Sequence, residues 1–383
     1  MKGNNIYIIY ESYTPNTAQT NRALAYLRSL EKMHMPVQVV FFLPDCKKSK
    51  LSDEFQYVKV KYCWEKYFIN HKVLKYLSYY YYVKRLLNQL SHGDKVYIYG
   101  LNDIKGYFIA RKDIEVYYEE TECPEVSLPG SWLHHPSLEE HLGQCRQLQG
   151  LIVISQQLKE YFISKGVSED KIHIVNMTVD SNRFNGLVKQ SAKNRYVAYC
   201  GTASNNKDGV DKLIRAFAIV SKAFPDLKLY IIGRLPSTDD QSGNLRLIER
   251  LGIKDKVVFT GVVNAEQMPQ LLKNAEMLAL ARPDNTQAKY GFPTKLGEYL
   301  LTGNPVVVTS VGDIPRYLTD GVSAMIAAPD DDESFAKKMI WVLEHPQEAA
   351  KIGECGKGVA MKNFNAEIET KKLAEVLMIN SSN

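Results

Sequence analysis

The sequence predicts an α/β protein with two doubly wound parallel sheets. Short runs that are apolar throughout alternate with amphipathic helical stretches, which is typical of a parallel sheet covered by helices on both faces. A polar stretch at 175–186 separates two blocks of this kind. The length of 383 residues also fits two domains better than one. We therefore expect one domain over 1–180 and a second over 181–365.

The N-terminal block begins with the apolar run IYIIY, followed by an amphipathic stretch that predicts a helix over 17–33. Further apolar runs recur along this block, with helical stretches between them. The predicted strands are 6–10, 37–43, 95–100, 114–120 and 151–155.

The C-terminal block alternates more regularly. Its predicted strands are 195–200, 227–233, 256–261, 276–281, 305–309 and 322–327. Its helices are expected near 209–223, 241–251, 265–274, 293–302 and 331–345. A last helix near 366–378 follows and packs against one of the two blocks. Ligands of doubly wound sheets bind beyond the carboxyl ends of the strands, so we expect the chemistry there.

Composition and charge narrow the class of protein. The chain is 45% hydrophobic and 24% charged, an ordinary globular composition. A net charge of +5 is too small a surplus to indicate nucleic-acid binding. The six cysteines contain no C-x-x-C pair, which favours a reduced compartment. No apolar run is long enough for a signal peptide or a membrane span, so we expect a cytoplasmic protein.

The stretch KYGFPTKLGEYLLTGNPVVVTS carries the clearest motif. Pro293 fits the first position of a helix, and Gly303 fits its end. Free backbone N–H groups in the first turn of such a helix favour a phosphate. Glu298, one turn deeper, is placed to accept hydrogen bonds from a ribose diol. The alternative, a surface pair between Lys295 and Glu298, stays equally open from the pattern alone.

Three further strand ends carry glycine or a basic residue. Lys207 follows the strand 195–200 and can reach a phosphate oxygen, or it is a solvated loop lysine. Arg234 follows Gly233 and is either an anion ligand or an exposed charge at the rim of the site. The segment 261–263 ends another strand and can offer backbone groups to a base. Together on one sheet edge, these strand ends indicate a nucleotide site.

The stretch ARPDNTQAKYGFPTKLGEYLLTGNPVVVTSVGD resembles the nucleotide-sugar signature of glycosyltransferase family 4, which are retaining enzymes of the GT-B fold. The resemblance covers most of 195–364 and is fainter over 151–184. N-terminal to residue 151, it lies mostly in the order of strands and helices. It implies two Rossmann-like domains that face a cleft. The N-terminal domain would take the acceptor, with 366–383 returning to it, and the C-terminal domain would take the donor.

The resemblance implies roles for individual residues. Glu298 matches the glutamate that binds the donor ribose, and Lys207 matches the lysine that neutralises the diphosphate. Thr294 and Lys295 match positions whose backbone amides meet the diphosphate. The full expected donor set is Gly201, Thr202, Arg234, Val262, Arg282, Phe292, Thr294, Lys295 and Glu298.

The sequence departs from the family at two positions. Tyr290 stands where the signature has its first glutamate, which normally contacts the transferred sugar, although a GFPTK-type form like this one occurs in a subset of the family. Many members also have an arginine directly after Gly201, where this chain has Thr202. Arg234 or Arg282 would then supply the positive charge. No metal or cofactor is expected if Lys207 and the helix N-terminus stabilise the leaving phosphate.

The acceptor side is expected in the N-terminal block. EVYYEETECPEV ends a strand, and Glu120 is either a catalytic or orienting residue or part of a solvated acidic loop. Asn21 and Arg22 follow the first strand and face either the acceptor or solvent.

Two other patterns in the N-terminal block carry alternatives. His141 and Cys145 lie one helical turn apart, with His134 and His135 nearby. The irregular spacing of these four residues favours a polar helix over a zinc site. The basic, aromatic stretch 58–90 is either a surface for anionic lipid or a core helix with lysines that reach out to solvent.

The resulting expectation is a cytoplasmic, metal-independent, retaining glycosyltransferase that is peripheral on the inner face of the plasma membrane. It would move a sugar from a UDP- or GDP-linked donor to a lipid-linked or saccharide acceptor in surface polysaccharide assembly, without binding nucleic acid. Two alternatives stay open: a nucleotide-sugar 2-epimerase of the same fold, and a non-catalytic nucleotide-sugar-binding partner, which the missing first glutamate motivates.

Overall fold

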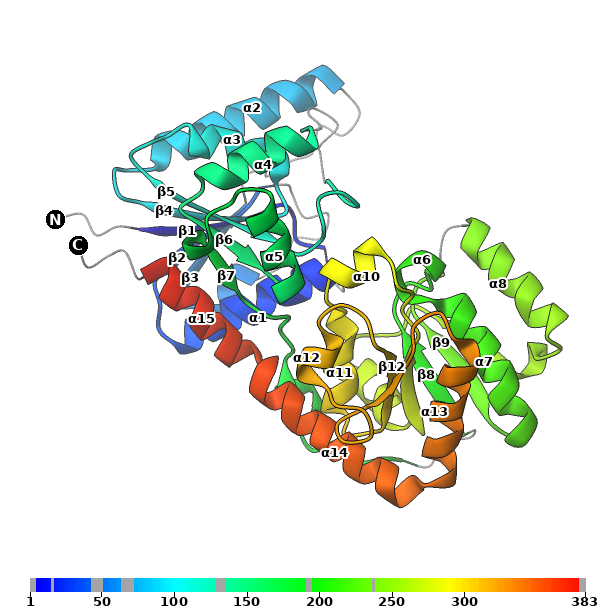
Figure 1. Cartoon of the computed structure of the whole chain (residues 1–383). Helices are drawn as coiled ribbons and strands as arrows, with labels where there is room; N and C mark the ends of the chain where they lie inside the picture. Colours follow the sequence, from blue (N-terminus) through cyan, green and yellow to red (C-terminus); the bar gives the residue numbers. More distant parts are fainter. Residues whose placement is uncertain are drawn as a thin grey trace. The chain divides into compact units, whose positions relative to one another are not determined.

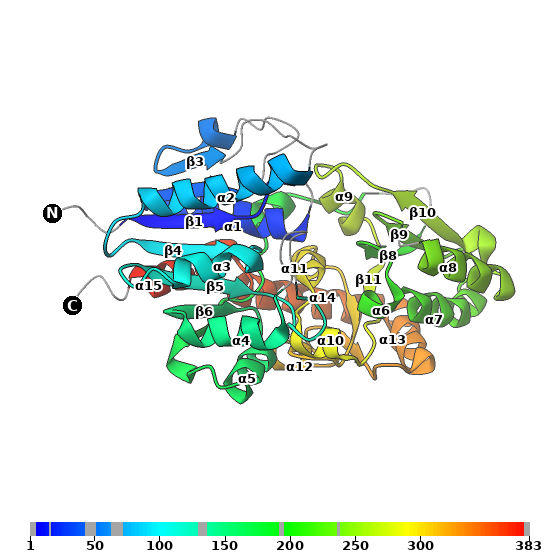
Figure 2. The same ribbon diagram turned by 90° about the horizontal axis from the view of Figure 1, so that it is seen from above.

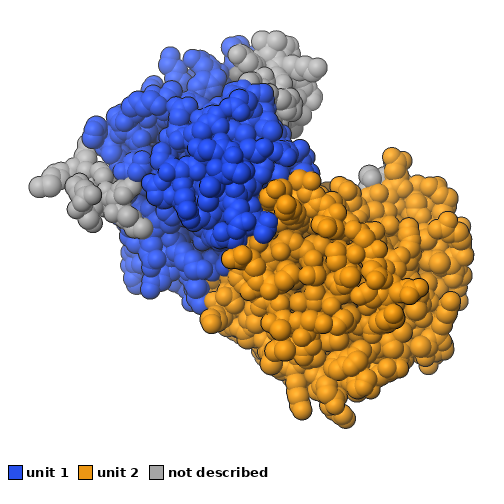
Figure 3. Space-filling view, viewed as in Figure 1, with its two compact units in different colours: residues 1–176, 366–383 blue, residues 177–365 orange. Residues whose placement is uncertain are grey.

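The computed structural model describes residues 5–14, 17–42, 51–62, 72–128, 136–190, 195–235 and 238–378. The chain divides into two compact units (Figure 3). Unit 1 contains residues 1–176 and 366–383, and unit 2 contains residues 177–365. The division between Asn176 and Met177 falls inside the polar stretch in which the sequence places the seam.

Unit 1 is built on a seven-stranded parallel sheet with the order β3-β2-β1-β4-β5-β6-β7. Its strands are β1 (Ile6–Tyr10), β2 (Val37–Phe41), β3 (Val58–Tyr62), β4 (Lys95–Tyr99), β5 (Glu115–Glu120), β6 (Gly150–Val153) and β7 (Ile172–Ile174). Its helices are α1 (Ala18–Lys32), α2 (Lys72–Gln89), α3 (Asn102–Ile109), α4 (Leu138–Gln147), α5 (Gln156–Ser164) and α15 (Ala366–Met378). The sequence did not predict β3 or β7.

Helices cover both faces of this sheet, as the apolar strands predict. Ile8 and Tyr10 point to the face on which α1 and α15 pack, in a cluster that includes Leu373. On the opposite face, Phe42 contacts Tyr79 of α2, and α3 and α4 lie beside it (Figures 1 and 2). The strands are therefore buried on both sides, which explains why they read as continuous apolar runs.

Arg22 lies in the core of unit 1, which corrects the expectation that it faces the acceptor or solvent. Its Nε donates to Glu119 on β5, and its two terminal nitrogens donate to the backbone carbonyls of Val175 and Asn176. The hydroxyl of Tyr97 also donates to Glu119. Because Arg22 shares the inward face of α1 with Tyr26, its charge is buried and must be paired. Arg22 thus fixes the last residues of unit 1 before the chain leaves it.

The C-terminal helix α15 is attached to unit 1 by two more buried charges. Lys95, at the start of β4, donates to the carbonyl oxygen of Leu377 at 2.7 Å. Glu369 accepts from the backbone N–H of Asn176 at 2.7 Å. Lysine near a helix C-terminus also interacts favourably with the helix dipole.

Unit 2 is built on a six-stranded parallel sheet with the order β10-β9-β8-β11-β12-β13. Its strands are β8 (Tyr196–Cys200), β9 (Lys228–Ile232), β10 (Val257–Gly261), β11 (Met277–Leu280), β12 (Val306–Thr309) and β13 (Met325–Ala327). Its helices are α6 (Asn205–Asp208), α7 (Val210–Ala223), α8 (Thr238–Arg250), α9 (Met268–Lys273), α10 (Thr286–Tyr290), α11 (Thr294–Leu301), α12 (Ile314–Tyr317), α13 (Asp332–Glu344) and α14 (Pro346–Asn363). The two Rossmann-like parallel sheets confirm the predicted fold class.

Two pairs of helices cover the sheet of unit 2. Helices α7 and α13 pack together on one face, and α11 and α14 on the other (Figure 1). The sequence did not predict α14, which is rich in glycine. A side chain at Gly353 would lie 2.4 Å from the carbonyl oxygen of Gly303, and one at Gly356 would lie 2.5 Å from that of Ser323. These glycines weaken the helix locally and permit its close packing.

The buried Arg22–Glu119 pair leads to a test of stability. We expect Arg22→Met to lower the free energy of unfolding by about 3–5 kcal/mol, because it leaves Glu119 as an uncompensated buried charge. Chemical denaturation followed by circular dichroism measures this change. Arg28→Met is the matched control in the same helix, since Arg28 is exposed and pairs with an exposed Glu54 at 3.9 Å. Equal effects of the two substitutions would contradict this role of Arg22.

Candidate nucleotide site

The predicted site residues of unit 2 gather at the carboxyl edge of its sheet. The strand order reverses between β8 and β11, and this switch point is where doubly wound sheets bind ligands. Gly201 and Thr202 follow β8, Lys207 lies in the short helix α6 that comes next, and Arg282 follows β11. The two strands that flank the switch point thus carry predicted site residues.

Glycines at this edge let the strand ends approach one another closely. Gly201 and Gly233 have φ of 145° and 126°, and a side chain at Gly233 would lie 2.5 Å from the carbonyl oxygen of Gly201. A side chain at Gly201 would lie 2.6 Å from the Nζ of Lys295. Position 201 therefore has a local packing requirement: only glycine fits between the strand and the lysine.

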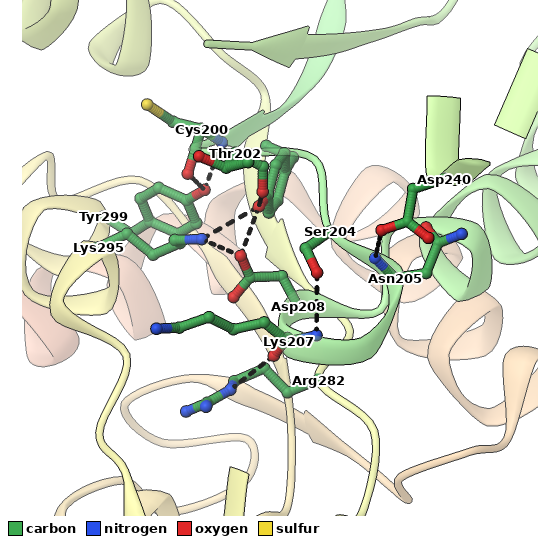
Figure 4. A network of polar contacts seen from close by, with 11 residues as sticks. Cys200, Thr202, Ser204, Asn205, Lys207, Asp208, Asp240, Arg282, Lys295 and Tyr299 are labelled. Carbon is green, nitrogen blue, oxygen red and sulfur yellow. Dashed lines mark hydrogen bonds and ion pairs between the residues drawn. The ribbon is translucent and has the colours of Figure 1, made fainter. Parts of the chain in front are cut away.

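Lys207 and Arg282 bring two positive charges to the switch point. The Oγ of Ser204 caps α6 by accepting from the backbone N–H of Lys207, whose side chain is exposed. Arg282 is buried, and its Nε donates to the carbonyl oxygen of Lys207 at 3.3 Å. The two side chains extend in the same direction (Figure 4). The candidate edge is therefore electropositive at this point.

A buried ion pair connects α11 to this loop. The Nζ of Lys295 donates to Asp208 at 2.5 Å and to the hydroxyl of Tyr199 at 3.0 Å (Figure 4). The side chains of Lys295 and Asp208 are 17% and 4% exposed. Burial would raise the pKa of Asp208, but the charge of Lys295 and the hydrogen bonds from Lys295 and Tyr199 outweigh it and lower that pKa. The carboxyl of Asp208 is therefore ionised at neutral pH.

Helix α11 presents its N-terminus at the same edge. Pro293 is the N-cap rather than the first helical residue, one position earlier than predicted. Within the described residues, the backbone N–H groups of Thr294 and Lys295 have no acceptor. Tyr299 holds the helix in place, because its hydroxyl accepts from the N–H of Cys200 at the end of β8. The two amides are thus available for an anion.

Glu298 forms an ion pair with Arg183 rather than with Lys295. Arg183 lies in a 3₁₀ turn at Ser181–Phe184, and it also donates to the carbonyl oxygen of Ala265. The side chains of Arg183 and Glu298 are 30% and 24% exposed. The alternative of a surface Lys295–Glu298 pair is therefore wrong, because the two residues contact different partners.

The other expected donor residues lie in different surroundings. The ring of Phe292 is buried against Tyr317 and Phe364, so its side chain belongs to the core. Val262 is 71% exposed, and the side chains of Thr202 and Arg234 are also exposed. These positions stay predictions.

In unit 1, Asn21 is exposed on α1, whereas Glu120 is buried at the end of β5 and not in a solvated loop. His141 and Cys145 are buried in α4, and no group of three or more His, Cys, Asp or Glu side chains in the described residues could hold a metal ion. His134 and His135 lie outside the described residues. So does the part 63–71 of the basic, aromatic stretch.

Sequence reasoning missed the partners that hold this site together. Asp208, Tyr199 and Tyr299 were not identified as partners, although they lie close in sequence to predicted site residues. Arg183 lies outside every predicted motif. The aspartate in NNKDG offered a signal, since it directly follows Lys207 at the end of a short helix. Nothing in the local sequence indicates that Arg183 pairs with a residue 115 positions away.

Comparisons with known proteins agree with this geometry. Residues 194–345 match the model of the family described as "Glycosyl transferases group 1". The mannosylfructose-phosphate synthase of Agrobacterium fabrum is 27% identical over 214 residues, which cover 52% of this chain and 46% of the relative. The chain is thus similar to group 1 glycosyltransferases over part of its length. The family match lies in unit 2, where the candidate site is.

A second relative and a solved structure extend the comparison. The GDP-mannose-dependent α-(1-6)-phosphatidylinositol monomannoside mannosyltransferase of Mycolicibacterium smegmatis is 28% identical over 187 residues, 48% of each chain. The chain thus spans about half the length of these relatives. Anabaena Alr3699/HepE, solved with UDP and glucose, superposes with a TM-score of 0.75 at 20% identity, covering 98% of this chain and 99% of that chain. Its likeness shows that the fold is GT-B.

The lowered pKa of Asp208 predicts a pH-dependent loss of stability. We expect Asp208→Asn to destabilise the protein at pH 7 by about 3 kcal/mol, because it leaves Lys295 without its buried counter-charge. A carboxyl with a depressed pKa stabilises the fold above its unfolded pKa, and this contribution is lost as the pH falls through the folded value. The difference between wild type and variant should therefore shrink in acid. Denaturation curves at several pH values measure it.

Asp226→Asn serves as the control for this substitution, because Asp226 is an exposed carboxylate in the turn between α7 and β9. Its effect should be small at every pH. A difference between Asp208→Asn and wild type that stays constant down to strongly acidic pH would contradict the assigned ion pair.

Proposed function

We propose that this chain is a retaining glycosyltransferase of family 4 with a GFPTK-type donor motif. It transfers a sugar from a UDP- or GDP-linked donor to a lipid-linked or saccharide acceptor. One observation carries the proposal: the N-terminus of α11 with its two free amides lies with Lys207 and Arg282 at the switch point of unit 2, and Glu298 follows one turn further along the same helix.

The proposed donor binds through its diphosphate. The free amides of Thr294 and Lys295 donate to phosphate oxygens, and the helix dipole favours the negative charge. Lys207 and Arg282 lie across the same edge and stabilise the charge that builds on the leaving phosphate as the bond to the sugar breaks. Ser204 caps the short helix that carries Lys207, and Arg282 donates to the carbonyl oxygen of Lys207. With these two cations at the site, the transfer is proposed to proceed without a metal.

Glu298 is proposed to bind the ribose of the donor. A carboxylate accepts two hydrogen bonds from a vicinal diol, and bonds to a charged group are among the stronger ones in proteins. Arg183 holds one carboxylate oxygen and leaves Glu298 about a quarter exposed. A fixed, partly exposed carboxylate suits this role.

The relatives support a class of donor, and they do not specify its base or its sugar. The solved complex of Anabaena Alr3699/HepE contains UDP and glucose, and the mycobacterial relative is named as GDP-mannose-dependent. Both support a nucleoside diphosphate as the ligand. In this chain, Tyr290 is half-buried at the position of the missing first glutamate, and we propose that it contacts the sugar in its place.

Unit 1 is proposed to take the acceptor. The mycobacterial relative is named for a phosphatidylinositol monomannoside acceptor, which is a glycosylated lipid. A setting in surface polysaccharide assembly is proposed from the resemblance to family 4 alone. The 2-epimerase and the non-catalytic partner are separated from this function by analysing products with and without an acceptor.

A membrane surface is the proposed source of a lipid-linked acceptor. Leu74, Leu77, Tyr80 and Tyr81 are exposed on α2, and Tyr107 of α3 contacts Tyr80 edge-on. Lys84 and Arg85 are exposed in the same helix. Apolar and aromatic side chains beside basic ones suit an interface with anionic lipid. No helix in the described ranges has the length and apolar character needed to cross a bilayer.

Glu298→Gln is the test of the donor site. We expect the KM for the donor to rise roughly tenfold to hundredfold, because hydrogen bonds to a charged acceptor are lost. Steady-state transfer or donor hydrolysis with a panel of UDP- and GDP-sugars measures it. Thermal shift with UDP and GDP gives an independent readout, since a ligand of the folded state raises the Tm.

Glu348→Gln controls for the same chemical change at an exposed site on α14. It should leave both the donor KM and the nucleotide-induced shift in Tm at wild-type values. An unchanged donor KM in Glu298→Gln, or no nucleotide binding by the wild type, would refute the proposed site.

The α2 surface predicts binding to charged vesicles. We expect the wild type to co-sediment with anionic vesicles at low salt and to dissociate as salt rises, because basic side chains contribute about 1 kcal/mol each near an anionic surface. The double variant Lys84→Glu/Arg85→Glu should bind at least tenfold more weakly.

Lys351→Glu/Lys362→Glu makes the same charge change at exposed positions of α14 in unit 2 and should bind like wild type. Equal binding to neutral and anionic vesicles would remove the electrostatic part of this proposal.

A further inference from the structure

A groove between α7 and α8 is a second candidate binding site in unit 2. It has a volume of about 480 Å³, within the range of pockets that hold small molecules. One face of α8 lines it together with residues of α6 and α7, and α7 packs against α8 (Figure 1). None of the lining residues belongs to the proposed nucleotide site. A ligand of this groove would therefore occupy a separate site.

The face of α8 that lines the groove carries two arginines. At helical spacing, this face presents Gly243, Arg246, Leu247 and Arg250. Arg246 and Arg250 are exposed, and neither forms an ion pair with a residue in the described ranges. Like charges one turn apart disfavour a helix slightly, so the helix itself gains nothing from this pair. An anion bound in the groove would offset that repulsion.

A third arginine lines the groove from α7. Arg215 lies there together with Asp211, and the two form an ion pair one turn apart on the helix at 3.3 Å. Arg215 also lies 3.8 Å from Asp332. The charged residues that line the groove are thus three arginines and one aspartate, which carry a net charge of +2. Because the planar guanidinium matches the oxygens of a phosphate, arginines gathered in one groove favour a phosphate group.

Gly243 keeps one wall of the groove free of a side chain. A Cβ added at this position would meet no atom within 4 Å, so close packing does not require glycine here. Glycine inside a helix also costs stability relative to alanine. Neither helix formation nor packing thus accounts for Gly243, whereas space for a ligand beside Arg246 and Arg250 does.

Asn244 lies at the buried floor of the groove and has an acceptor without a donor. It is 1% exposed, and its Nδ2 donates to the Oδ1 of Asn205 at 3.0 Å. The same Oδ1 accepts from the backbone N–H of Asp211 at 3.2 Å, which identifies it as the oxygen and so fixes the orientation of the Asn244 amide. The Oδ1 of Asn244 is buried and has no hydrogen-bond partner in the part of the chain that the structure describes. An unpaired buried acceptor costs free energy, and a ligand hydroxyl is a donor that would satisfy it.

We propose that this groove binds a small phosphorylated hydroxy compound, such as a sugar phosphate or a polyol phosphate. Arg215, Arg246 and Arg250 bind the phosphate, whose charge of about −2 at neutral pH matches the positive charge of the groove. A hydroxyl of the same molecule donates to the Oδ1 of Asn244. The inference does not depend on the proposed glycosyl transfer, because the groove shares no residue with the nucleotide site.

Chemical labelling of arginines locates the site directly. Phenylglyoxal modifies exposed guanidinium groups, and mass spectrometry measures the rate at each residue. We expect glucose 6-phosphate to slow the labelling of Arg246 and Arg250 at least threefold and to leave that of Arg316, exposed on α12, unchanged. Glucose, and sodium chloride at equal ionic strength, should protect neither residue. No protection by glucose 6-phosphate, or equal protection by salt, glucose or inorganic phosphate, overturns the inference.

Thermal shift with a variant of the groove tests the same site independently. We expect glucose 6-phosphate to raise the Tm of the wild type, and Arg246→Gln/Arg250→Gln to need at least tenfold more ligand for the same rise. Both arginines are exposed, so these substitutions should leave the fold intact. Arg316→Gln/Lys351→Gln removes the same charge at exposed positions elsewhere in unit 2 and should respond like the wild type. An unchanged rise in Arg246→Gln/Arg250→Gln would place the ligand at another site and overturn the inference, whereas the proposed function is tested separately by nucleotide binding.

Discussion

The buried ion pair between Lys295 and Asp208 is the interaction on which the candidate site depends. It joins α11 to the short helix α6 that follows β8; α11 carries the free amides, and α6 carries Lys207. Two charges this poorly hydrated persist only when each has its partner and further hydrogen bonds. Tyr199 supplies one of these bonds, and Tyr299 fixes α11 to the same strand end. The pair thus fixes the position of α11 more than it raises the free energy of unfolding.

Close backbone packing makes this pair possible. A side chain at Gly201 would occupy the space of the Lys295 ammonium, and one at Gly209 would lie 1.9 Å from the carbonyl oxygen of Ala281. Gly209 also has φ of 65°, in the left-handed region that glycine tolerates. The glycines after the strands therefore serve the site indirectly. They let charged side chains reach one another through a tightly packed sheet edge.

The same use of buried charge occurs at the end of unit 1. Arg22 and Glu369 bond to the backbone of Val175 and Asn176 from α1 and α15, which lie far apart in sequence. Apolar packing alone would allow several registers of the chain at this point, because contacts between apolar groups depend little on orientation. A paired charge with fixed hydrogen bonds has one good geometry. Burying these charged groups costs free energy of desolvation. In return, their hydrogen bonds fix the position at which the chain leaves unit 1.

Local patterns in the sequence predicted most of the fold but few of its contacts. Strands that are apolar throughout, such as Val306–Thr309, were predicted because burial on both faces leaves a strong signal. The strand Val58–Tyr62 was missed, because its alternating lysines belong to an edge strand inside a basic stretch. Lys207, Lys295 and Glu298 were found through their motif. Their partners were not, because an ion pair between residues 87 or 115 positions apart leaves no local pattern.

The charges of the site also explain why a carboxylate can stand beside a proposed diphosphate. Glu298 alone would repel phosphate oxygens, and Asp208 would do the same. Each is paired with a cation from another segment, Arg183 in the first case and Lys295 in the second. Lys207 and Arg282 bring two further positive charges to the same edge. Positive charges of this kind attract a diphosphate, and the paired Glu298 is still able to accept hydrogen bonds from a sugar hydroxyl. In the proposed site, ribose and phosphates would therefore be recognised by different residues.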